Sequence, residues 1–112
     1  MSLAYTDAVQ RIKEQAALND ADIARATGAS VATVRAWRAH RQAPSGDRAR
    51  RIAELSAITE QLAGVISAEA ISLWLNKPVA RLGHRAPADV LAAGGHAEVA
   101  AAIGELEYPT FA

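Results

Sequence analysis

The side chains of this sequence best suited to a chemical role are those of arginine, and the role they suit is the binding of anions. Between positions 25 and 51 the only acidic residue is Asp47. Guanidinium groups bind phosphate oxygens with an affinity that depends on salt and does not depend on the sequence of the nucleic acid. We expect phosphate contacts from six of these arginines, with an ordinary solvated helix face as the alternative for each: Arg25, Arg38, Arg41, Arg48, Arg50 and Arg51.

Groups that could catalyse a reaction or hold a metal are sparse. His40, His84 and His96 lie far apart in the sequence, and none has another histidine, a cysteine or a carboxylate at ligand spacing. Glu98 follows His96 by two positions, which places the two on different helix faces. The absence of cysteine excludes disulfides and thiolate metal sites. We therefore expect no catalytic residue, no metal site and no cofactor, so that the chain is not an enzyme.

Composition and charge limit the size of the fold and suggest two partners. The 112 residues, 51% of them hydrophobic, suffice for a small helical core and not for a large enzyme cleft. The net charge is zero, yet residues 1–55 carry +3 and residues 56–112 carry −3. The opposite signs suggest that the first half binds a polyanion and the second half a different partner. The alternative is an ordinary uneven distribution of surface charges. With no signal-peptide pattern and no long apolar run, we expect a cytoplasmic chain without contact to a membrane.

These side chains must be positioned by helices. Alanine-rich windows repeat apolar residues at spacings of three and four, and prolines fall between the windows. The sequence therefore predicts an all-α fold in which residues 1–55 form one domain, residues 56–107 a second and residues 108–112 a tail. A long helix is expected to join the two domains. The predicted helices cover about residues 6–18, 20–28, 30–40, 47–64, 67–76, 87–94 and 96–107.

Residues 20–39 have the pattern of a helix-turn-helix. Two closely crossing helices need a small residue at the crossing, a glycine in the left-handed turn and an apolar anchor in the second helix. Ala24, Gly28 and Val34 fill these places, and Ser30 can cap the second helix. The segment resembles the Xre and phage-repressor type of helix-turn-helix. The alternative is any tight helical hairpin with a glycine turn.

The resemblance implies that the second helix enters the major groove of DNA. Arg35 is the only residue of this helix expected to recognise a base strongly, because an arginine discriminates guanine from other bases by about 1–3 kcal/mol. Val31 and Ala32 offer only apolar contact to a thymine methyl group. Family members often have Gln, Arg or Ser at these positions. We therefore expect a single copy to bind weakly and a homodimer to bind two half-sites. The predicted DNA-binding residues are Ser30, Val31, Ala32, Thr33, Arg35, Arg38 and Arg41.

The second half carries a sharper resemblance. Residues 74–78 read Trp-Leu-Asn-Lys-Pro, and a Leu-Gly step at 82–83 precedes Arg-Ala-Pro-Ala-Asp-Val-Leu at 85–91. This order is similar to the toxin-binding domain of the Xre/MbcA/ParS family of antitoxins, over about residues 5–107. The family implies a partner toxin with a RES domain, which degrades NAD. It further implies an antitoxin that neutralises this toxin, represses its own operon by binding operator DNA, and works as a homodimer within a hetero-oligomer.

The same resemblance implies which residues bind the toxin: Trp74, Leu75, Lys77, Leu82, Arg85, Glu105, Glu107, Tyr108 and Phe111. Trp74 and Leu75 are adjacent on a helix, so one should enter the core while the other faces outward. The alternative is that the apolar members are all core residues. The tail could reach into the toxin's NAD pocket with a carboxylate, or it could be a frayed end folded back on the body.

Two other functions remain open. The chain could be a stand-alone transcriptional repressor whose second half only dimerises, and no toxin would then accompany it. It could also be an interaction protein whose helix-turn-helix no longer binds DNA. Val31 and Ala32, which offer bases only apolar contact, are consistent with this alternative. Salt-sensitive binding to operator DNA distinguishes the second of these from the antitoxin.

Overall fold

The fold consists of helices, as predicted. The computed structural model describes the backbone of residues 3–108 and the side chains of residues 8–108, and in this part of the chain the extended structure is limited to an isolated bridge between Val79 and Arg85. The helices are α1 (Leu3–Ala16), α2 (Asp20–Thr27), α3 (Val31–Arg38), α4 (Gly46–Ala63), α5 (Ala68–Asn76), the 3₁₀ turn η1 (Ala80–Leu82), α6 (Pro87–Ala92) and α7 (His96–Glu107).

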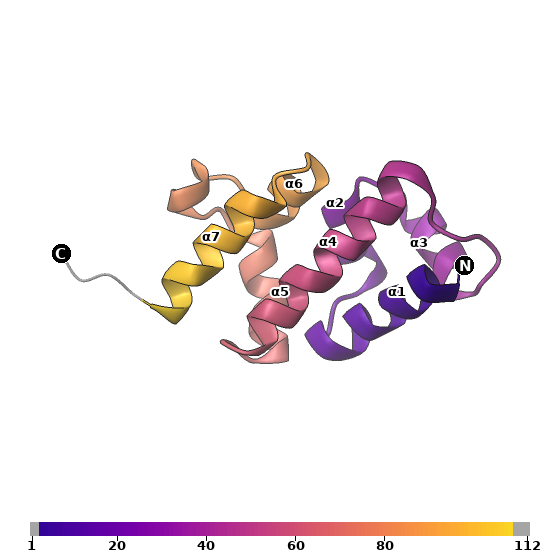
Figure 1. Ribbon diagram of the computed structural model, residues 1–112, viewed down its shortest axis with the longest axis horizontal. Helices are drawn as coiled ribbons and strands as arrows, with labels where there is room; N and C mark the ends of the chain where they lie inside the picture. Colours follow the sequence, from indigo (N-terminus) through magenta and orange to yellow (C-terminus); the bar gives the residue numbers. More distant parts are fainter. Residues whose placement is uncertain (1–2, 109–112) are drawn as a thin grey trace.

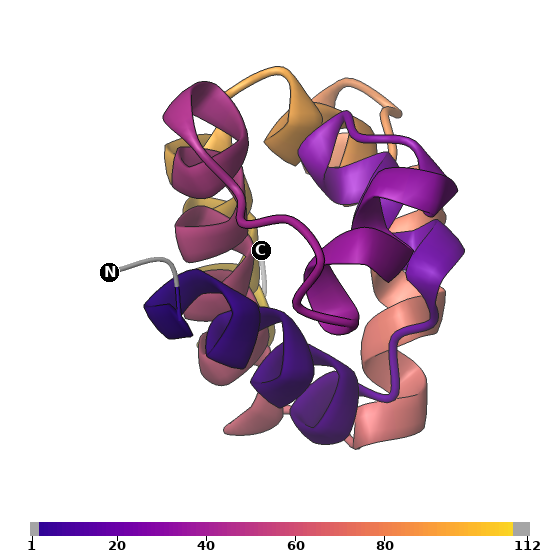
Figure 2. The same cartoon turned by 90° about the vertical axis from the view of Figure 1, so that its right-hand side faces the viewer.

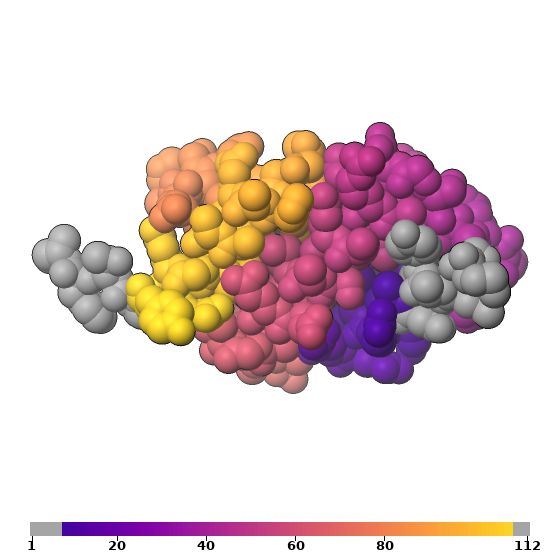
Figure 3. All heavy atoms as spheres, viewed as in Figure 1, coloured from indigo at the N-terminus to yellow at the C-terminus, as the bar shows by residue number. Residues whose placement is uncertain are grey.

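Helix α4 lies at the centre of an elongated molecule. It contacts α1, α2, α5, α6 and α7, and the molecule measures 50 × 23 × 21 Å along its principal axes. Helices α1 and α3 lie at one end of the long axis, while η1 and the C-terminal part of α7 lie at the other (Figure 1). On the face shown in Figure 3, α4 and α7 form a continuous surface. Helix α2 packs on α3 and also on α6, so the first half of the chain contacts the second directly.

Side chains placed just before the helices explain where several of them begin. The Asn19 side chain accepts a hydrogen bond from the Asp22 N–H, and the Asp22 carboxylate accepts one from the Asn19 N–H, which satisfies two otherwise unpaired donors. Ser30 caps α3 through the Thr33 N–H, as predicted, and Ser67 caps α5. Pro87 is the first residue of α6, where its missing N–H has no intrahelical partner to lose.

The first helix differs from its predicted range. It runs from Leu3 to Ala16 and not from residue 6 to residue 18. Ala17 has a φ of 51°, in the left-handed region that breaks a right-handed helix, and Leu18 then enters the core. Nothing in the local sequence indicates this break, because alanine rarely adopts the left-handed conformation.

One core runs through the whole described chain. Ile12, Trp37 and Ile52 from the first half and Leu75 and Leu91 from the second belong to the same cluster of buried side chains. The predicted domain boundary at residue 55 falls inside α4, whose buried residues lie on both sides of it. None of the described helices combines the length and apolarity that crossing a membrane requires.

Candidate functional site

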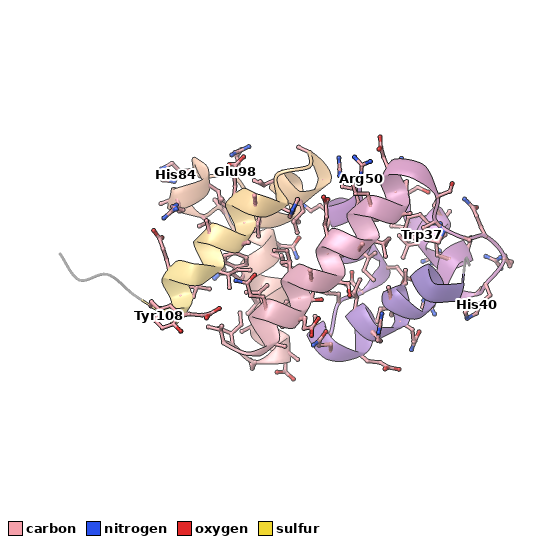
Figure 4. All side chains as sticks on the ribbon, in the orientation of Figure 1. Trp37, His40, Arg50, His84, Glu98 and Tyr108 are labelled. Carbon is pink, nitrogen blue, oxygen red and sulfur yellow. The ribbon has the colours of Figure 1, made fainter. Side chains whose placement is uncertain are left out.

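The turn between α2 and α3 has the geometry that its sequence pattern requires. Gly28 has a φ of 76°, in the left-handed region, and its N–H donates to the Ala24 carbonyl. Ala24 and Val34 are buried where α2 and α3 pack against each other and the core. Trp37, on α3, is 1% exposed and belongs to the core (Figure 4). The turn and α3 lie on the face of the molecule that Figure 2 presents.

The predicted DNA-binding residues divide by burial. Ser30, Ala32, Arg35 and Arg38 are exposed on or beside α3, and Arg41 is exposed in the loop that follows. Val31 and Thr33 are half-buried, and Val31 packs against the core. The hydroxyl of Ser30 lies 2.9 Å from that of Thr33 and accepts the Thr33 N–H, so both hydroxyls serve the helix cap. Helix α3 therefore presents mainly arginine to a partner on its outer face.

Asp20 connects α3 to its surroundings through a set of ion pairs. The Arg38 guanidinium donates to both carboxylate oxygens of Asp20, at 2.7 and 3.2 Å. Lys13 from α1 donates at 3.0 Å, and Arg35 Nε lies 3.7 Å away. The hydrogen bond from Arg38 lowers the pKa of Asp20, and the same contact raises the pKa of Arg38. The carboxylate is therefore charged at neutral pH.

Five of the six arginines expected at phosphates have partners inside the molecule, since Arg38 pairs with Asp20 and Arg50 Nη1 lies 3.9 Å from Asp47. Arg25 donates to both oxygens of Asp89 at 2.8 Å, and Arg51 donates to Glu54 at 3.0 Å and weakly to the Ala92 carbonyl. The Arg48 side chain donates to the carbonyl of the turn glycine at 3.0 Å. Arg25 and Arg51 thus link the first half of the chain to Asp89 and Ala92 of α6.

A polar network that the sequence did not reveal joins α2 to α5 and α6. The Asn76 amide donates to Asp22 at 3.0 Å and accepts from Arg25 at 2.9 Å, and Ser72 donates to Asp22 at 3.0 Å. The contact between Arg25 and Asp89 lowers the pKa of Asp89 and raises that of Arg25. The paired residues lie 50 or more positions apart, so no local pattern could have indicated them.

The two residues of the Trp-Leu pair in the second motif differ in burial. Leu75 is 2% exposed and belongs to the core, whereas Trp74 is half-buried and packs against the core from its edge. The outward apolar residue of α5 is instead Leu73, which is 61% exposed. Leu82 is also 2% exposed. Leu75 and Leu82 therefore act as core residues in this conformation and offer no side-chain surface to a partner.

The charged residues predicted to bind the toxin are partly engaged within the chain. Arg85 donates to Glu98 at 3.0 Å and to the Leu82 carbonyl at 2.7 Å, and Arg81 pairs with Glu105. These contacts fasten the segment around η1 to α7. In Figure 4 Glu98 lies beside the loop that carries His84.

The remaining predicted toxin-binding residues lie on the surface or outside the described part. Lys77 directly follows α5 and is exposed, as are Glu107 and Tyr108 at the end of α7, with Tyr108 78% exposed. Phe111 lies outside the described residues. His40, next to α3, and Tyr108 lie near opposite ends of the long axis (Figure 4).

The described residues contain no cluster of three or more His, Cys, Asp or Glu side chains suited to a metal ion. A surface hollow of about 510 Å³ beside the α2–α3 turn is lined by Thr27, Gly28, Ser45, Asp47, Arg48, Arg51 and Ala92. The charged residues of this lining are Asp47, Arg48 and Arg51, and the lining contains a serine but no histidine.

The fold and the surfaces together define a small helical chain with exposed arginines on α3 and exposed apolar side chains on α5 and at the end of α7. No protein-family model and no curated protein sequence matches it. Among solved structures, it is similar to a chain of the M. tuberculosis MbcT-MbcA toxin-antitoxin complex, with a TM-score of 0.82 and 26% sequence identity. The match covers 96% of this chain and 96% of the other. The chain therefore has a fold that occurs in a toxin-antitoxin complex.

Proposed function

We propose that this chain is an antitoxin that binds and neutralises a toxin protein encoded beside it. The observation that carries the proposal is the structural match to a chain of a toxin-antitoxin complex over 96% of both chains. The Trp-Leu and Leu-Gly motifs in the second half favour a toxin with a RES domain that degrades NAD. In this proposal the antitoxin acts in the cytoplasm by covering the toxin's active site and carries out no reaction itself.

Exposed apolar side chains support a protein partner for the second half. Among the described residues, the large apolar side chains with high exposure are Leu73, Leu106 and Tyr108, all beyond the end of α4. Leucine and tyrosine side chains on a surface lose contact with water when a partner covers them, which stabilises a complex. We expect α5 and the end of α7 to contact the toxin, together with the exposed residues Lys77 and Glu107.

The α2–α3 segment supports a second activity, the repression of the chain's own operon. Helix α3 exposes Arg35 and Arg38 along one side, at a spacing of three residues, and Arg41 follows in the loop. A helix-turn-helix places such a helix in the major groove, with arginine as its reader and phosphate contacts around it. We propose that a homodimer within the toxin complex binds two half-sites of operator DNA.

Co-expression with the product of the neighbouring gene tests the antitoxin function. We expect the two proteins to copurify and the chain to restore growth to cells that express the toxin. Replacing Leu73 with aspartate should weaken the complex at least about tenfold, since it places a charge in an apolar contact. Arg35→Ala is the matched control, because it also changes an exposed helix residue but should leave toxin affinity unchanged.

The DNA-binding assay should give the reverse result. Arg35→Ala should weaken binding to the DNA upstream of the gene, while Leu73→Asp should not. A chain that binds this DNA but never copurifies with a neighbouring product is a stand-alone repressor. One that copurifies but binds no DNA even at low ionic strength is an interaction protein with a relic helix-turn-helix. A chain that neither copurifies with a neighbouring product nor binds this DNA would contradict the proposed function.

A further inference from the structure

Three cationic side chains from two helices meet one carboxylate beside α3. Asp20 is in the first turn of α2, and its side chain is only 13% exposed. Lys13 Nζ lies 3.0 Å from it and Arg38 Nη2 lies 2.7 Å from it. Arg35 Nε stands 3.7 Å away and is itself 64% exposed. The cluster thus has three positive charges and one negative charge at the edge of the surface proposed to face DNA.

This arrangement constrains the two arginines in different ways. Arg38 uses Nε and Nη2 in a two-point contact with Asp20, which fixes the plane of its guanidinium group. Arg35 lies one turn earlier on the same side of α3, within the electrostatic reach of the same carboxylate. Asp20 therefore orients Arg38, draws Arg35 toward the α2 side of the helix, and cancels part of their charge.

We propose that Asp20 is a positioning residue for DNA binding, which holds Arg38 in place on α3, attracts Arg35 electrostatically, and lowers the attraction of both to DNA of any sequence. The inference rests on the DNA-binding function proposed above and adds to it a source of sequence discrimination. Phosphate attraction does not depend on sequence, whereas the base contact of an arginine needs a fixed geometry. A carboxylate that weakens the first and supports the second increases discrimination without touching DNA.

Removing the negative charge should therefore strengthen binding to DNA of random sequence. Asp20→Asn frees Arg38 and Lys13 and removes one group that repels phosphate. One additional phosphate contact steepens the dependence of log affinity on log salt by about 0.9, which corresponds to roughly tenfold in affinity near 50 mM salt. Affinity for the operator should rise less, since Arg38 loses its fixed orientation and Arg35 loses the carboxylate that attracts it. The ratio of the two affinities should then fall.

Fluorescence anisotropy with two labelled duplexes provides the measurement. One duplex has a random sequence, and the other covers the DNA upstream of the gene. Glu98→Gln is the matched control, because it removes the same charge, from α7, and frees an arginine, Arg85, between η1 and α6, away from α3 (Figure 1). We expect Asp20→Asn to gain about tenfold on the random duplex with a steeper salt dependence, while Glu98→Gln binds as the wild type does.

Two results would overturn the role of Asp20. One is an Asp20→Asn chain that binds the random duplex no more tightly than the wild type or keeps its discrimination, and the other is an equal gain by Glu98→Gln, which would make net charge the cause. Circular dichroism checks folding, and Asp20→Ser, with the same expected gain, replaces the asparagine variant if that variant does not fold. A wild-type chain that binds neither duplex at low salt removes the DNA-binding function itself and the role of Asp20 with it.

Discussion

Asn76 ties α2 to α5, and its replacement by alanine tests how firmly the two halves of the chain are joined. The amide donates to the Asp22 carboxylate at 3.0 Å and accepts from Arg25 at 2.9 Å. A hydrogen bond to a charged group contributes about 1.5–3 kcal/mol when shielded from water, and less where water can replace it. Since the side chain is only half-buried, we expect Asn76→Ala to lower the free energy of unfolding by about 2 kcal/mol.

Thermal and urea unfolding provide the assay. A loss of this size should lower the Tm by about 8 °C for a chain of this length. Lys77→Ala is the control, because Lys77 is the exposed neighbour of Asn76 and its change should stay within about 0.5 kcal/mol of the wild type. Both proteins should unfold in one transition, since a single core connects the two halves.

A double-mutant cycle separates the network from a local effect on α5. Arg25 contacts both Asn76 and Asp89, so Asn76→Ala and Asp89→Asn should not be additive and should show a coupling energy of about 0.5 kcal/mol or more. Strict additivity, or an Asn76→Ala chain as stable as the Lys77→Ala control, would refute the argument that these hydrogen bonds join the halves.

Two further predictions concern α5 and the response to acid. Leu75→Ala should lower the free energy of unfolding by about 2–5 kcal/mol, because Leu75 is buried, whereas Leu73→Ala, at an exposed position, should change it by less than about 0.5 kcal/mol; equal losses in urea unfolding would contradict the assignment of core and surface. Asp89 has a pKa below its ordinary value of 3.8 because Arg25 donates to it, so it stabilises the fold above that pH and stops doing so as the pH falls through the lower folded value. Asp89→Asn should therefore be less stable than the wild type at pH 7 and approach it in acid, and a difference that grows as the pH falls would contradict this sign.

The sequence indicated most of the helices because their signals are local. Caps such as Ser30 and Ser67, the proline at position 87 and the repeated apolar spacing each act within a few residues. The end of the first helix was predicted too late because the change of direction at Ala17 depends on a backbone conformation that alanine rarely adopts. A glycine there would have been a recognisable signal, as Gly28 was in the next turn.

The candidate site was predictable only in part. The sequence placed Arg35 and Arg38 on one exposed helix, and the structure puts them there. It could not show that Asp20, 15 and 18 positions earlier, faces both of them, nor that Arg25 turns to Asp89. For the Trp74-Leu75 pair, periodicity required one inward and one outward side chain, but Leu73 is more exposed than either.

The amino-acid sequence by itself determined the helical class, most helix limits, the left-handed turn at Gly28 and the segregation of arginine into the first half, because each follows from the preferences of neighbouring residues. Only the tertiary structure decided which charges are paired and which apolar residues remain exposed. That choice depends on how α2, α5, α6 and α7 pack around α4, and ion pairs such as the one between Arg25 and Asp89 form between residues that only this packing brings together.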